Sequence, residues 1–153
     1  MQFGDAPAAL AHLLKLPERS ALELERAEQE IVAVEQRYDL RLPDDFRLHL
    51  QRMGPGETEV WDDELILWWP TGRLRNLPDE YPEGSRNPDI AAEANRYVFF
   101  ADYSIWCWAW AICCSDGKNR GKVAAISAGD AFVADSFNDF AARYLADPMS
   151  IMP

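Results

Sequence analysis

Residues 105–114 read IWCWAWAICC, and this stretch decides the expected architecture. Successive side chains of a strand point to opposite faces of a sheet, so one face carries isoleucine, cysteine and alanine, and the other carries three tryptophans and an isoleucine. Neither face is polar, which predicts a central strand that is covered on both sides. The face of small residues would let a helix approach closely, whereas the tryptophan face would either fill a second layer of the core or line a cleft.

Apolar stretches on both sides of this strand predict the rest of the sheet, at residues 65–69, 97–101, 122–127 and 131–135. Asp116-Gly117 and residues 128–130 mark tight turns. A final helix is expected at 137–145, where Ser136 is a good N-cap and Asp139 stands three residues on, as in a capping box.

The first third of the chain is expected to be helical. Asp5 is placed to cap a short helix, and Ser20 with Glu23 forms a capping box for a longer one. Pro43 suits the first position of a third helix, which Gly54 ends. Helices, an antiparallel meander and one closing helix make an α+β fold. We expect a single domain over residues 1–153, with its core at about 20–147, in which N-terminal helices and one C-terminal helix pack on a mostly antiparallel sheet.

The chain is acidic: its 153 residues include 26 Asp and Glu against 15 Lys and Arg, for a formal net charge of −11. This length fits one domain with a sizeable core. The charge argues against binding to nucleic-acid phosphates, which requires clustered Lys and Arg. It suits a basic protein partner, because complementary fields speed encounter, but charge alone favours the plainer explanation of solubility.

The N-terminal residues MQFGD lack the basic start and long apolar run of a signal peptide, and no stretch reaches the ~18–20 apolar residues of a membrane span. Cys107, Cys113 and Cys114 fall within one expected strand, where neighbours point to opposite faces, so no disulfide framework is expected. These features predict a cytoplasmic protein with reduced thiols and no membrane partner.

No group of residues predicts catalysis or metal binding. The two histidines, His12 and His49, stand on expected helices far from the cysteines, and no Cys-x-x-Cys occurs. The cysteines lie among Trp, Ala and Ile rather than beside a base, and Ser136 lacks the Gly-x-Ser-x-Gly turn of a hydrolase nucleophile. A pair of carboxylates is the enzymatic alternative that remains, without a specific signal. We therefore expect no enzyme, no cofactor and no metal.

Residues 57–64, the acidic segment, hold five acids and no base, with aromatic residues inside and just after them. Aromatic side chains beside carboxylates are typical of protein interfaces. The segment therefore predicts a partner-binding surface formed by Glu57, Glu59, Trp61, Asp62, Asp63, Glu64, Trp68 and Trp69. Since Trp68 and Trp69 face opposite ways in the expected strand, one or both could instead be core. Reversal of Asp62 and Asp63 to lysine is expected to slow association and to leave stability nearly unchanged.

Four segments, in this order, resemble the SUKH superfamily. They are 31–47, which contains LRLPDDFR; 61–69, with three tryptophans; YVFFAD at 97–102, which leads into the tryptophan strand; and ADSF at 134–137, followed by Phe140 and Leu145. The chain departs from the family in lacking the glycine-rich stretch that members often carry after the Phe-Phe-type strand, and this leaves the partner open.

The resemblance implies a SUKH-like α+β fold and an immunity protein of a polymorphic, toxin–antitoxin-like system, which binds and neutralises a cognate bacterial toxin, commonly a nuclease. An acidic, aromatic surface would occupy a basic cleft of the toxin or hold it inactive, so a basic toxin is expected. The alternative is a non-catalytic regulatory or scaffold module that binds proteins, since the superfamily also includes cell-wall regulators. We expect no direct contact with nucleic acid, and a monomer is favoured.

Overall fold

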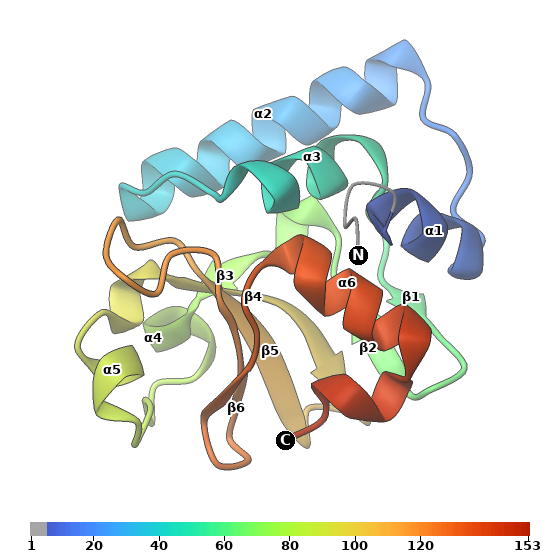
Figure 1. Ribbon diagram of the computed structural model, residues 1–153. Helices are drawn as coiled ribbons and strands as arrows, with labels where there is room; N and C mark the ends of the chain where they lie inside the picture. Colours follow the sequence, from blue (N-terminus) through green and yellow to red (C-terminus); the bar gives the residue numbers. More distant parts are fainter. Residues whose placement is uncertain (1–5) are drawn as a thin grey trace.

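The computed structural model describes residues 6–153 as one sheet with helices on both faces. Figure 1 shows α2 and α3 side by side above the sheet, α6 in front of it, and α4 and α5 in a separate group. The helices are α1 (Ala6–Leu13), α2 (Ala21–Tyr38), α3 (Asp44–Arg52), α4 (Leu77–Glu80), α5 (Pro88–Ala91) and α6 (Phe137–Ala146). Short 3₁₀ turns are η1 (Thr71–Arg73), η2 (Ala94–Arg96) and η3 (Pro148–Ile151).

The strands form one antiparallel sheet in the order β1-β2-β4-β5-β6-β7, and β3 also pairs with β4. They are β1 (Val60–Trp61), β2 (Ile66–Trp68), β3 (Arg75–Asn76), β4 (Tyr97–Tyr103), β5 (Trp108–Cys113), β6 (Val123–Ile126) and β7 (Ala131–Ala134). The α+β prediction, with N-terminal helices and one C-terminal helix on an antiparallel sheet, is confirmed.

The face of the sheet that carries the four longer helices, the helical face, holds the larger core cluster. Trp110 and Ile112 of β5 pack there with residues of α1, α2, α3 and α6. Trp110 is fully buried, and its indole N–H donates to the Ile151 carbonyl at 2.9 Å. Trp108 is half-buried and stacks on Tyr103 with ring centroids 4.2 Å apart. The tryptophan face is therefore core and not a cleft.

The opposite face, the second face, carries Ala109, Ala111 and Cys113 of β5, as their alternation with the tryptophans predicts. The expected close helix is replaced by two short helices, which contribute Leu77 from α4 and Ile90 from α5. Large aromatic side chains from loops and neighbouring strands fill the remaining space above the small residues, so the long helices do not need to cover this side.

Local sequence sets the helix starts. The Ser20 and Glu23 capping box is present, and the Ser136 hydroxyl accepts from the Asp139 amide at 2.9 Å. The Asp139 carboxylate reaches one residue further back than expected and accepts from the Asp135 amide at 2.9 Å. Pro43 immediately precedes α3 instead of opening it, because its extended ψ of 143° places it outside the helix. The expected cap at Asp5 lies outside the described residues.

The prediction of a strand over 105–114 is wrong at its start. Residues 104–107 form the β4–β5 turn, in which Ser104, Ile105 and Trp106 have φ values of 46°, 58° and 62°. The Cys107 amide closes the turn on the Tyr103 carbonyl at 2.8 Å, and the Trp106 amide donates to Asp102 at 2.9 Å. Trp106 consequently packs on the second face, opposite to the face of Trp108 and Trp110.

Candidate binding surface

The first half of the acidic segment is neutralised by basic residues from other elements. Glu57 forms an ion pair with Arg26 of α2. Glu59 lies 3.1 Å from Arg73 of η1, whose guanidinium stacks over the Trp69 ring at 4.1 Å from its centroid. The segment contains no base, but the fold supplies two, so Glu57 and Glu59 contribute little net charge to the surface.

Asp62 is a structural residue of the turn between β1 and β2, which spans residues 62–65. One of its carboxylate oxygens accepts from the Glu64 and Ile66 amides at 2.8 and 2.9 Å, and the other accepts from the Trp68 indole at 3.0 Å and from the Tyr144 hydroxyl of α6. The pKa of Tyr144 is raised, mainly by burial and secondly by this hydrogen bond to Asp62. Replacement of Asp62 would therefore alter the fold as well as the surface charge.

Asp63, Glu64 and Trp61 are exposed residues of the segment that line the groove described below. Among residues 6–153, no cation lies within ion-pair distance of Asp63 or Glu64. Trp61 is 53% exposed and lies opposite Leu67 across the β1–β2 pair. These three residues keep the predicted combination of free carboxylates and an accessible aromatic ring.

Trp68 and Trp69 cannot offer their side chains to a partner, because each is only 1% exposed. They point to opposite faces of the sheet, Trp68 into the helical-face cluster and Trp69 into the second-face cluster. Their indole N–H groups are also used, since Trp68 donates to Asp62 at 3.0 Å and Trp69 to Asp102 at 2.7 Å. Their place in the predicted binding surface is corrected to the core.

A groove of about 320 Å³ lies beside the β1–β2 turn. One wall is formed by residues 61–64, and the other by the end of α1 and by the C-terminal end of α6 with the start of η3. Leu13, which is 52% exposed, and Leu145 supply apolar lining. Three acids and one base, Lys15, line the groove, so it is a negatively charged hollow with an apolar wall.

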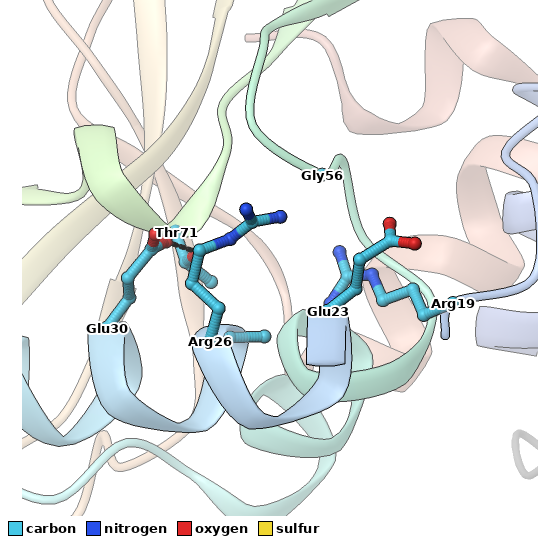
Figure 2. Close-up of a pocket in the computed structure, with 7 residues that line it drawn as sticks. Arg19, Glu23, Arg26, Glu30, Gly56 and Thr71 are labelled. Carbon is cyan, nitrogen blue, oxygen red and sulfur yellow. Dashed lines mark hydrogen bonds between the residues drawn. The ribbon is translucent and has the colours of Figure 1, made fainter. Parts of the chain in front are cut away.

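Figure 2 shows a second, polar pocket, between α2, the loop at Gly56 and Thr71. Its volume is about 10 Å³, which is room for one water molecule at most. Arg19 donates to the carbonyls of Leu50, Gln51, Gly54 and Pro55, and Glu30 binds the Thr71 hydroxyl. These bonds satisfy the free carbonyls at the end of α3 and fix the chain that leads into the acidic segment. The residues of this pocket therefore hold neighbouring segments of the chain together, and the pocket leaves no space for a ligand.

Two of the three cysteines, Cys113 and Cys114, and His49 are buried in inert surroundings. Burial raises the pKa of the Cys113 and Cys114 thiols, and burial lowers the pKa of His49 to about 3. Cys107 is exposed. No three His, Cys, Asp or Glu side chains within the described range are grouped as a metal site. In the same range, none of the helices combines the length and the apolar character needed to cross a membrane.

Sequence reasoning missed several residues of this surface. Leu13 and Tyr144 carry ordinary helical spacing, which predicts burial but not a position beside the acidic segment. Leu65 and Ile105 were expected in strands, yet they are 54% and 85% exposed. The turns that expose them contain no glycine or proline, which are the strongest turn signals.

Comparison with known families supports the resemblance seen in the sequence. Residues 27–143, more than half of the chain, match the SMI1 / KNR4 family (SUKH-1). No curated protein matches the chain. Members of the family are typically immunity proteins of polymorphic toxin systems, and its domains are generally non-catalytic. The match includes the acidic segment and residues 137–143 of α6, so the wall of the groove formed by residues 61–64 lies within it, whereas Tyr144, Leu145 and the end of α1 lie outside it. The chain belongs to the SMI1 / KNR4 family (SUKH-1).

Proposed function

We propose that this protein is an immunity protein that binds a cognate bacterial toxin and neutralises it without catalysing a reaction. The observation that carries the proposal is the negatively charged groove with an apolar wall, present on a member of a family of typical immunity proteins. The toxin is expected to present a basic face, such as the substrate cleft of a nuclease.

Charge supports a basic partner in two ways. The whole chain carries a formal charge of −11, which attracts a cationic protein over long range. At close range, Asp63 and Glu64 lack cation partners within the part of the chain that the structure describes, so an incoming lysine or arginine would not need to displace one. Such charges act mainly on the rate of association.

Apolar contacts would hold the complex once it forms. Trp61 and Leu13 are each about half exposed and both line the groove. Burial of an aromatic side chain at an interface typically contributes more than a rim charge does. The proposed mechanism is therefore steric: the partner's basic surface is covered, and its substrate is excluded.

The function is tested by co-expression in bacteria with the cognate toxin, which is sought first among the products of neighbouring genes. Parent protein should restore growth and should co-purify with the toxin. Growth arrest despite full expression of the folded protein would contradict an immunity role. Stable binding to a host regulator, without protection from the toxin, would instead support the scaffold alternative.

The surface is tested separately with two matched charge reversals. Glu64→Lys changes the groove, whereas Glu25→Lys makes the same change at an exposed site on α2. Glu64→Lys should slow association by roughly threefold or more at low salt and should flatten its dependence on ionic strength. Equal rates for the two variants would place the binding surface elsewhere.

A further inference from the structure

We propose that Ile105, with Leu65 beside it, is a preformed apolar anchor for the same protein partner; this inference rests on the proposed function. Ile105 is 85% exposed and Leu65 is 54% exposed. The Ser104 amide donates to the Leu65 carbonyl at 2.9 Å, so the β4–β5 turn and the β1–β2 turn lie side by side. Together they form a small apolar projection at one end of the sheet.

The backbone of this projection is unusual for its residue types. Leu65, Ser104, Ile105 and Trp106 all have positive φ values, between 46° and 68°. Glycine and asparagine adopt this region readily, whereas a β-branched isoleucine is disfavoured there. The Ile105 side chain also buries little surface in the free protein. Neither local conformation nor core packing therefore explains an isoleucine at this position.

The turn is held firmly by the residues around it. Trp106 packs against Tyr81 and Phe99, with ring centroids 5.4 Å away in both cases, and its indole donates to Glu80 at 2.9 Å. Asp102, which is 2% exposed, accepts from the Trp106 amide at 2.9 Å. An anchor that is already rigid loses little conformational entropy when it binds. Strained residues that the surroundings hold in place are found preferentially at binding sites.

The acids next to the projection indicate the chemistry of its partner. Asp63 and Glu64 directly precede Leu65 in the chain. A partner that accepts the apolar projection in a socket would therefore gain from lysine or arginine side chains around the rim of that socket, where they would face these two acids. The same acids would be repelled by an anionic membrane, which argues for a protein surface over a lipid one. The partner that fits is the basic protein of the proposed function, with an apolar socket about one side chain wide.

The test compares Ile105→Gly and Ile105→Asn with Leu22→Asn, which replaces an apolar residue that is 75% exposed on α2. The probe is a catalytically inactive form of the toxin from which the parent protein protects cells. Both Ile105 variants should bind it about tenfold more weakly or worse, because an anchor side chain is lost. Their melting temperatures should be equal to or above that of the parent, and Leu22→Asn should bind within about twofold of the parent.

Each outcome decides between the two proposals. Unchanged affinity of both Ile105 variants, with tight binding by the parent, overturns the anchor and leaves the immunity role standing. Lower melting temperatures for both variants would show that Ile105 supports the free fold, which also overturns the anchor. A parent protein that neither protects from the toxin nor binds it overturns both proposals.

Discussion

The β1–β2 turn and the β4–β5 turn are held in similar ways, each by one aspartate that accepts from a tryptophan indole. Asp62 accepts from Trp68 at 3.0 Å, and Asp102 accepts from Trp69 at 2.7 Å. Trp68 and Trp69 are consecutive residues whose side chains enter opposite core clusters. The two aspartates therefore attach neighbouring turns to the two faces of the sheet.

The two aspartates differ in their exposure to water. Asp62 is half-buried and lines the groove, whereas Asp102 is 2% exposed and lies 3.9 Å from Arg73. Water can replace some of the bonds that Asp62 makes, but it has little access to those of Asp102. An acid in a charged surface segment can therefore be structural, and its sequence neighbours need not share its role.

The largest effect is expected at Asp102. Asp102→Ala leaves the buried Trp69 indole and the Trp106 amide without an acceptor, so the free energy of unfolding should fall by about 3 kcal/mol. Denaturant unfolding followed by tryptophan fluorescence measures the loss. Asp102→Asn keeps one acceptor oxygen and should lose less. A loss below about 1 kcal/mol for the alanine variant would mean that the turn does not depend on this residue.

A smaller effect is expected at Asp62, and it separates this residue from its neighbour. Asp62→Ala removes four hydrogen bonds, partly replaceable by water, and should cost about 2 kcal/mol. Asp63 is exposed, so Asp63→Ala should change the free energy of unfolding by less than about 0.5 kcal/mol. The same unfolding experiment compares them. Equal losses of unfolding free energy in the two variants would mean that Asp62 is only a surface charge, as the sequence suggested.

The unfolding free energies of the Asp62 and Asp102 variants are best compared at neutral pH, because the buried His49 lowers the stability of the whole fold in acid. The pKa of His49 is lowered from 6.5 to about 3, mainly by burial and secondly by the positive charge of Arg19. The buried Nδ1 atom of His49 has no hydrogen-bond partner among residues 6–153. The unfolded chain takes up a proton below pH 6.5, whereas the folded chain does not, so stability falls as the pH drops from about 6.5 towards 3.

His49→Leu should remove this part of the pH dependence, which amounts to at most ~1.4 kcal/mol per pH unit. The measurement is the free energy of unfolding at pH 7, 6 and 5 for parent and variant. A constant offset at all three values reports lost packing against Phe137, and the difference in slope reports the proton. Identical slopes would show that His49 takes up its proton in the folded protein at the same pH as in the unfolded chain.

Much of the fold followed from short-range patterns. The Ser20–Glu23 capping box placed α2, the Ser136 N-cap placed α6, and the alternation of tryptophan with alanine assigned the two faces of β5. Of the residues predicted for the binding surface, Trp68 and Trp69 are buried and Asp62 is half-buried, whereas Trp61, Asp63 and Glu64 are exposed without an ion-pair partner among residues 6–153. The start of β5 was missed, because an apolar run without glycine or proline predicts a strand throughout.

The class of fold, the core strand and the family could be predicted from the amino-acid sequence, because periodicity, helix caps and the order of short motifs are properties of the linear chain. The roles of individual acids and tryptophans, in contrast, depend on contacts between distant parts of the chain. Arg26 and Arg73 neutralise Glu57 and Glu59 from distant positions, Tyr144 binds Asp62 across the groove, and Asp102 holds Ile105 outside the core through Trp106. Charge and burial depend on which elements meet in space, and that information is absent from any local segment.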